Sequence, residues 1–226
     1  MEKPVLTIPK LIETAKIFCE AESTFSNPTL YGVTDGKAVG TLIEQKFKSL
    51  LLNSYTAEIG NAAFGIDLPS ADILTDIKVT SIRQPQSSCP FKDSRQKIFG
   101  LGYNLLVFVY DKKDDALTKT ALLDFVSCTF VEAERTADFQ TTMMLKQMIE
   151  NQANEDDIFA YLEDKQLPGG EPLLRQIAKQ ILQTPITQGF LTISNALQWR
   201  LQYNRIVNLQ EQVEGITRII GKVSKP

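Results

Sequence analysis

Apolar residues recur at steps of three and four along several segments of the chain, the spacing that places them on one face of an α-helix. The clearest such segment begins at Thr34 or Asp35, either of which can cap the first turn of a helix. Its apolar positions are Val39, Leu42, Ile43, Phe47 and Leu50. The same spacing between Leu11 and Phe18 predicts a short helix within the N-terminal segment 1–33.

A second pattern is typical of buried β-strands. Residues 103–110, YNLLVFVY, form a nearly continuous apolar run, as expected of a strand that is buried on both faces. A charged turn over 111–115 and a returning strand over 118–131 are predicted to follow it. Upstream, a short strand is expected to end at Pro69. A tight turn then connects it to a longer strand that includes Val79.

The last third of the chain is predicted to be helical. Its candidate helices span residues 137–149, 156–166 and 171–182. From Gln188 onward, apolar residues again recur at alternating steps of three and four. These positions are Ile206, Leu209, Val213, Ile216, Ile220 and Val223. The seam is too short for a coiled coil, so packing within its own domain is favoured over self-association.

These elements together predict an α/β protein in which helices flank a mixed central sheet. Three parts are expected along the chain: an N-terminal segment over 1–33, the α/β core over 34–135, and a helical region over 136–226. No internal repeat or low-complexity segment interrupts them.

The composition excludes several kinds of chemistry. The chain contains no histidine, which removes Ser-His-Asp and Cys-His catalysis as well as histidine zinc sites. Three cysteines without CxxC spacing, Cys19, Cys89 and Cys128, are expected to be free thiols in a reducing cytoplasm. No run of about 18 apolar residues is present, so no membrane span is expected. The net charge of −3 neither supports nor excludes a nucleic-acid partner.

An acidic cluster is predicted at one end of the hairpin. Residues two apart on a strand point to the same face, so Asp76, Lys78 and Thr80 project together. Asp67 lies on the neighbouring strand, and Glu44 lies at the edge of the apolar stripe of the preceding helix. Mg²⁺ binds one or two carboxylates and completes its shell with phosphate oxygens. Asp67 and Asp76 would hold such a metal, with Glu44 as a further acid. Lys78 would then orient a water and stabilise charge on a phosphate.

The D-x-K triplet alone is weakly informative, since most copies are solvated strand ends. Here Asp67-Leu68-Pro69 precedes Asp76 by nine residues and apolar strand residues flank the triplet, which makes the pattern more specific. Asp72 is an alternative to Asp67 as the first acid. It is only four residues from Asp76 and is therefore expected to lie in the turn.

This set of residues resembles the PD-(D/E)xK nuclease superfamily, with Asp67 as the first acid and Asp76-Ile77-Lys78 as the D/E-x-K element. The segment 36–44, GKAVGTLIE, is similar to the first core helix of that superfamily, whose glycine and glutamate frame the site. Within the superfamily the pattern is similar to type II restriction endonucleases and to MutH-like nicking endonucleases. The resemblance covers about residues 34–131. The chain departs from the namesake motif in that its proline follows the first acid by two places.

The resemblance implies a restriction-endonuclease-like core that uses Mg²⁺ to hydrolyse phosphodiester bonds of double-stranded DNA. It also implies a cytoplasmic bacterial protein. Cutting both strands of a symmetric site favours a homodimer with two active sites. The region 136–226 lies outside the resemblance and is a candidate for dimerisation or for clamping DNA.

The segment after the predicted catalytic strand is expected to emerge beside the scissile phosphate. Residues 81–91 are polar and contain two prolines, which predicts a loop, and 92–99 can form a short helix. The candidate DNA contacts are Arg83, Gln84, Gln86, Ser87, Ser88, Lys92 and Arg95. Arginine suits guanine and glutamine suits adenine in the major groove, because each can pair with two atoms of the base. Each residue is equally well explained as an ordinary polar loop residue.

A sequence-specific type II restriction endonuclease is therefore the leading interpretation. The alternatives are a MutH-like nicking endonuclease and a non-catalytic DNA-binding module of the same fold. The second alternative is disfavoured because a decayed site would be expected to lose one member of the set Glu44, Asp67, Asp76 and Lys78.

Overall fold

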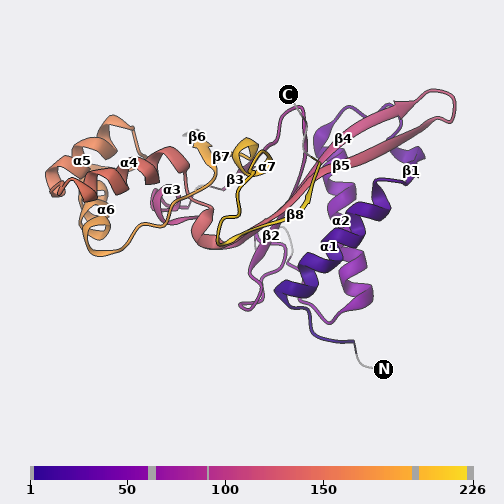
Figure 1. The fold of residues 1–226 in the computed structure, drawn as a ribbon, viewed down its shortest axis with the longest axis horizontal. Coiled ribbons are helices and arrows are strands. Elements are labelled where there is room, and N and C mark those ends of the chain that lie inside the picture. The colour runs from indigo at the N-terminus through magenta and orange to yellow at the C-terminus, as the bar shows by residue number, and fades with distance from the viewer. Residues whose placement is uncertain (1–2, 61–64, 91, 195–198, 223–226) are drawn as a thin grey trace. The chain divides into compact units, whose positions relative to one another are not determined.

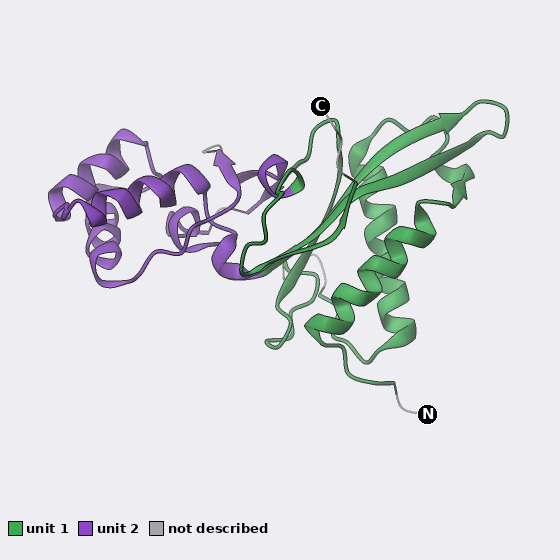
Figure 2. Cartoon of the chain, viewed as in Figure 1, with its two compact units in different colours: residues 1–86, 104–131, 207–226 green, residues 87–103, 132–206 purple. Residues whose placement is uncertain are grey.

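The computed structural model describes residues 3–60, 65–90, 92–194 and 199–222 (Figure 1). Its helices are α1 (Ile8–Glu22), η1 (Pro28–Leu30), α2 (Gly36–Ser54), α3 (Gln96–Phe99), η2 (Ala133–Arg135), α4 (Phe139–Glu150), α5 (Glu155–Asp164), α6 (Glu171–Gln183) and α7 (Asn204–Val207). Its strands are β1 (Ser26–Asn27), β2 (Thr75–Ser81), β3 (Gln86–Cys89), β4 (Asn104–Asp115), β5 (Thr120–Val131), β6 (Thr192–Ser194), β7 (Trp199–Gln202) and β8 (Ile216–Gly221). The chain divides into two compact units, shown in different colours in Figure 2. Unit 1 comprises residues 1–86, 104–131 and 207–226, and unit 2 comprises residues 87–103 and 132–206.

Unit 1 is built on a mixed sheet, as the sequence predicts. The strand order is β1-β5-β4-β2, with β8 also paired to β5. β2 runs parallel to β4, in a register that places Thr75 opposite Asn104 and Ser81 opposite Tyr110. β4 and β5 are antiparallel along their whole length. β2 therefore ends the strand order, which leaves one of its edges available to the segments that precede it.

α1 and α2 lie on one face of this sheet (Figure 1). Their contact with the sheet is centred on four phenylalanines, in which Phe47 lies 5.1 Å from Phe18 and 5.0 Å from Phe108 between ring centroids. Phe108 in turn packs edge-on against Phe125 of β5. The sequence predicts both helices, and the structure confirms them. The Asp35 side chain caps α2 by accepting a hydrogen bond from the Lys37 N–H at 2.9 Å.

Gly40 of α2 packs directly against Val79 of β2. A Cβ atom at this position would lie 3.4 Å from the carbonyl oxygen and 3.8 Å from the Cβ of Val79. Gly40→Val would place two further methyl groups in this space, and we expect it to lower the free energy of unfolding by about 1–3 kcal/mol. Urea unfolding measures the change. Gly36→Ala is the matched control, because a Cβ there meets nothing within 4 Å, and equal losses in the two variants would contradict this account.

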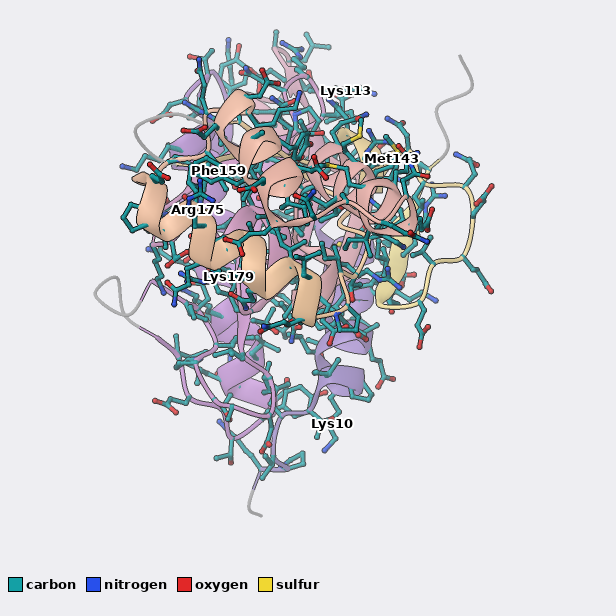
Figure 3. All side chains as sticks on the ribbon, turned by 90° about the vertical axis from the view of Figure 1, so that its left-hand side faces the viewer. Lys10, Lys113, Met143, Phe159, Arg175 and Lys179 are labelled. Carbon is teal, nitrogen blue, oxygen red and sulfur yellow. The ribbon has the colours of Figure 1, made fainter. Side chains whose placement is uncertain are left out.

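Unit 2 contains the helices α4, α5 and α6, close to the ranges that the sequence predicts. The α5 helix starts with a capping box in which Asn154 and Asp157 each bind the backbone N–H of the other. α5 and α6 share a buried core, and the Arg175 guanidinium of α6 lies 4.3 Å from the ring centroid of Phe159 on α5 (Figure 3). A three-stranded sheet in the order β3-β7-β6 completes the unit.

Three local predictions between residues 81 and 115 differ from the structure. The predicted loop over 81–91 contains the strand β3, and the predicted helix over 92–99 is reduced to the single turn of α3. The charged residues 111–115 do not turn but continue β4, with the turn at 116–119. Charged residues and prolines indicate that a segment is exposed to solvent. They do not exclude a strand, because a strand can carry polar residues on its solvent face.

The prediction of helix from Gln188 onward is also wrong. This part of the chain forms β6, β7, the short α7 and β8, and Val223 lies outside the described residues. Gly215 adopts a positive φ of 80° immediately before β8, a conformation that ends a helix. Ile216 and Ile220 then pair with Val131 and Cys128 of β5, which satisfies their backbone groups in the sheet.

The three cysteines are free and buried, which confirms the prediction of free thiols. Among the described residues, no helix has both the length and the apolar character that crossing a membrane requires.

Candidate active site

Asp76 and Lys78 lie on β2 and point to the same face, as the two-residue spacing requires. The Lys78 ammonium contacts Asp76 Oδ2 at 2.7 Å. Asp76 is only 4% exposed, whereas Ile77 between them points into the core formed with α1 and α2. β2 thus places the buried Asp76 carboxylate in contact with the Lys78 ammonium.

Asp67 reaches the same place from an irregular segment rather than from the strand that the sequence predicts. Leu68 and Thr75 form a single antiparallel bridge, with backbone hydrogen bonds of 2.9 and 3.0 Å, and this bridge holds the bend beside β2. The Ile77 N–H donates to Asp67 Oδ2 at 2.8 Å. The edge of β2 that lies away from β4 therefore fixes the first acid directly.

Glu44 and Lys48 extend the cluster onto α2. Lys48 lies one helical turn after Glu44, and its ammonium contacts Glu44 Oε1 at 2.7 Å and Asp67 Oδ1 at 2.5 Å. The structure thus links all four predicted site residues through direct contacts, with Lys48 as an additional member. Sequence reasoning missed Lys48, and its one local signal was the i,i+4 spacing from Glu44.

The two aspartates interact with each other. Burial raises the pKa of Asp76 to about 7, an effect that Lys78 opposes and that the hydrogen bond to Asp67 reinforces. Burial would also raise the pKa of Asp67, but its hydrogen bonds with Asp76, Lys48 and the Ile77 N–H outweigh it and lower that pKa. The raised pKa of Asp76 and the lowered pKa of Asp67 make Asp76 the member of the pair that takes up a proton as the pH falls below about 7.

This donor set fits a hard divalent cation. Mg²⁺ is commonly bound through one or two carboxylates, with substrate phosphates and water completing its shell. Asp67 and Asp76 bring two carboxylates together in a largely buried position. Within the described ranges, no cluster of three or more acidic, histidine or cysteine side chains is arranged to hold a metal. Glu44 does not complete such a cluster because Lys48 lies between it and Asp67.

Asp72, the alternative first acid, lies in the exposed turn that precedes β2. Asp67, in contrast, contacts β2 and shares a hydrogen bond with Asp76. The geometry therefore favours Asp67 as the partner of Asp76.

Comparison with known proteins shows what kind of chain carries this cluster. Residues 5–218 match the family described as "Type II restriction enzyme NspV". The chain belongs to the NspV family of type II restriction enzymes. One relative, named type II restriction enzyme NspV, from Nostoc sp. strain PCC 7524, is 54% identical over 215 residues, covering 95% of this chain and 97% of the relative. No solved structure matches the chain. The predicted resemblance to type II restriction enzymes is thus confirmed, while the roles of the individual site residues stay predictions.

The predicted DNA contacts of this NspV-family chain occupy different environments. Arg83, Gln84, Ser88 and Lys92 are exposed. Ser87 is half-buried, and its hydroxyl lies 2.5 Å from the Tyr203 hydroxyl within unit 2.

Gln86 and Arg95 are also half-buried. The Arg95 guanidinium donates to Asp93, Gln176 and Gln180 at 2.8, 2.9 and 3.0 Å, which ties the segment before α3 to α6. Each of its three nitrogens makes one of these bonds, so Arg95 has a structural role, and its contact with DNA stays a prediction.

Proposed function

We propose that this chain is a Mg²⁺-dependent endonuclease that cuts both strands of duplex DNA at a specific sequence. The observation that carries the proposal is the joined cluster of Asp67, Asp76 and Lys78 within a chain of the NspV family. The relative's name supplies the type of enzyme, and the cluster supplies residues suited to the chemistry. The proposed DNA-contacting set is Arg83, Gln84, Gln86, Ser87, Ser88, Lys92 and Arg95.

Asp67 and Asp76 would hold the metal ion, which supplies positive charge against the scissile phosphate when it is bound. The Ile77 N–H and Lys48 fix both oxygens of Asp67, so this carboxylate is oriented before substrate arrives. Lys78 is held against Asp76 at 2.7 Å, from where its ammonium can orient the attacking water and donate to a phosphate oxygen. Catalysis then rests on positioned charges, which need no histidine.

The test is digestion of a long unmethylated viral DNA and of a supercoiled plasmid, with Mg²⁺ and with EDTA. We expect discrete fragments that require Mg²⁺, because cutting at one sequence yields a fixed set of ends. Asp67→Asn should lower the rate of cutting by roughly 10²-fold or more, since it removes a charged ligand of the proposed metal. Asp72→Asn is the matched control and should cut at the wild-type rate.

The plasmid also reports how the two strands are cut. Linear product without accumulated nicked circles indicates two active sites acting together, as expected of a homodimer on a symmetric site. Nicked circles without discrete fragments would instead favour a MutH-like enzyme. Intact DNA under every condition would exclude the endonuclease and leave a DNA-binding module.

A further inference from the structure

Lys48 occupies an unusual position for a lysine in a cluster of acids. Its side chain is 17% exposed, and its ammonium lies between Glu44 Oε1 and Asp67 Oδ1, at 2.7 and 2.5 Å. It approaches the site from α2, on the side of Asp67 that faces the helix, while Lys78 approaches from β2 and contacts Asp76. The two lysines thus contact different acids and cannot substitute for each other.

The charges of the cluster show what Lys48 changes. Glu44, Asp67 and Asp76 contribute three negative charges when all are ionised, and Lys48 and Lys78 contribute two positive ones, which leaves a net charge of −1. Without Lys48 the same cluster would carry −2. A divalent cation at the aspartates would then meet twice the net negative charge and would no longer be repelled by a fixed ammonium in contact with one of its ligands.

We propose that Lys48 is a positioning residue that fixes Asp67 and Glu44 and sets how tightly the site binds its divalent cation. The inference rests on the proposed metal-dependent function and assigns a second lysine to that site. Lys48 restrains Asp67 Oδ1, and the Ile77 N–H restrains Oδ2, so the carboxylate is held by a helix and a strand at once. Lys48 orients Asp67, but its positive charge also weakens the attraction of the cluster for a metal ion that arrives without DNA.

The proposal predicts changes of opposite sign in two binding equilibria. In Lys48→Met, which keeps all but one atom of the side-chain length and removes its charge, Mn²⁺ should bind about tenfold or more tightly in the absence of DNA. A duplex of arbitrary sequence in EDTA should bind about two- to threefold more weakly, because the phosphates meet a more negative site. Cleavage should slow although the metal binds better, because Asp67 has lost one of its two restraints.

The experiment titrates Mn²⁺ into the full chain and follows the electron paramagnetic resonance signal of the free ion, while fluorescence anisotropy measures binding of the duplex. Lys46→Met is the matched control. Lys46 lies on the same helix with its side chain 30% exposed, and it forms a 2.8 Å ion pair with Glu22. Lys46→Met should leave both equilibria unchanged, because the Lys46 ammonium contacts Glu22 and the Phe25 ring and not the site acids. Lys48→Arg keeps the charge and should bind Mn²⁺ within about threefold of the wild-type affinity.

The outcomes separate this inference from the proposed function. Tighter Mn²⁺ binding in Lys48→Met alone supports the role of Lys48. Equal affinities in the wild type and Lys48→Met, or equal gains in Lys46→Met and Lys48→Met, would overturn it and leave the proposed function standing. A wild-type chain that binds no Mn²⁺ would overturn both. If Lys48→Met fails to fold, Lys48→Arg decides: an Mn²⁺ affinity far from that of the wild type would then contradict the charge-based account.

Discussion

Lys78→Ala is expected to lower the rate of DNA cleavage by roughly 10²- to 10³-fold while leaving DNA affinity within about threefold of wild type. The reason is the position of the ammonium, which is held at 2.7 Å from Asp76 and is 19% exposed at the side-chain level. A charge fixed in a partly buried site acts on the reacting phosphate and the attacking water, where charge develops in the transition state. One phosphate contact contributes little to total DNA affinity, because many such contacts add up along the duplex.

Single-turnover cleavage and anisotropy in EDTA measure the two quantities separately. Lys113→Ala is the control for removing a positive charge from the surface, because the Lys113 side chain is 67% exposed and its 3.5 Å ion pair with Asp111 lies far along β4. It should change neither quantity by more than about threefold. If Lys78→Ala lost DNA binding together with cleavage, Lys78 would have to be reassigned to docking.

The parts of this site that one element determines could be predicted from the sequence. Asp76 and Lys78 share a face because any strand places residues two apart on one side. The capping residue Asp35 and an apolar stripe predict the helix that carries Glu44, and both features are present in the structure. Local periodicity was sufficient for these elements, because the backbone geometry alone decides where their side chains point.

The parts that depend on pairing between distant segments could not be predicted in this way. β8 is a strand because it pairs with β5, so the spacing of its isoleucines carried no local sign of that partner. Lys48 joins the site only because α2 lies close to the bend that contains Asp67. From the sequence, Glu44 and Lys48 form an i,i+4 pair like many others on solvated helices.

In the absence of divalent metal, the stability of the wild-type chain should fall as the pH rises from about 4 to 7. The pKa of Asp76 is raised from 3.8 to about 7 by burial first and by its hydrogen bond to Asp67, against the opposing effect of Lys78. Between these two pH values the folded chain holds a proton that the unfolded chain has lost. Raising the pH therefore favours the unfolded state throughout this window, with a cost that reaches at most about 4 kcal/mol above pH 7.

Asp67 acts in the opposite direction and in a different window. Its pKa is lowered from 3.8 because its hydrogen bonds outweigh the effect of burial. The stability that it contributes is present above its unfolded pKa and is lost as the pH falls below about 4. A series between pH 5 and 8 therefore isolates Asp76, since Asp67 stays ionised in both states across that range.

Asp76→Asn removes the titrating group, and its amide can donate a hydrogen bond to Asp67 in place of a protonated carboxyl group. In EDTA at pH 8 we expect this variant to be more stable than wild type by about 2–4 kcal/mol, equivalent to roughly 4–16 °C in the thermal midpoint. Its stability should hardly change between pH 5 and 8, and added Mg²⁺ should stabilise the wild type but not the variant. Asp72→Asn, in the exposed turn, should follow the wild-type pH profile. A flat wild-type profile over this range would show that Asp76 is already ionised at pH 5, and the two carboxylates would then have to be held together by the lysines alone.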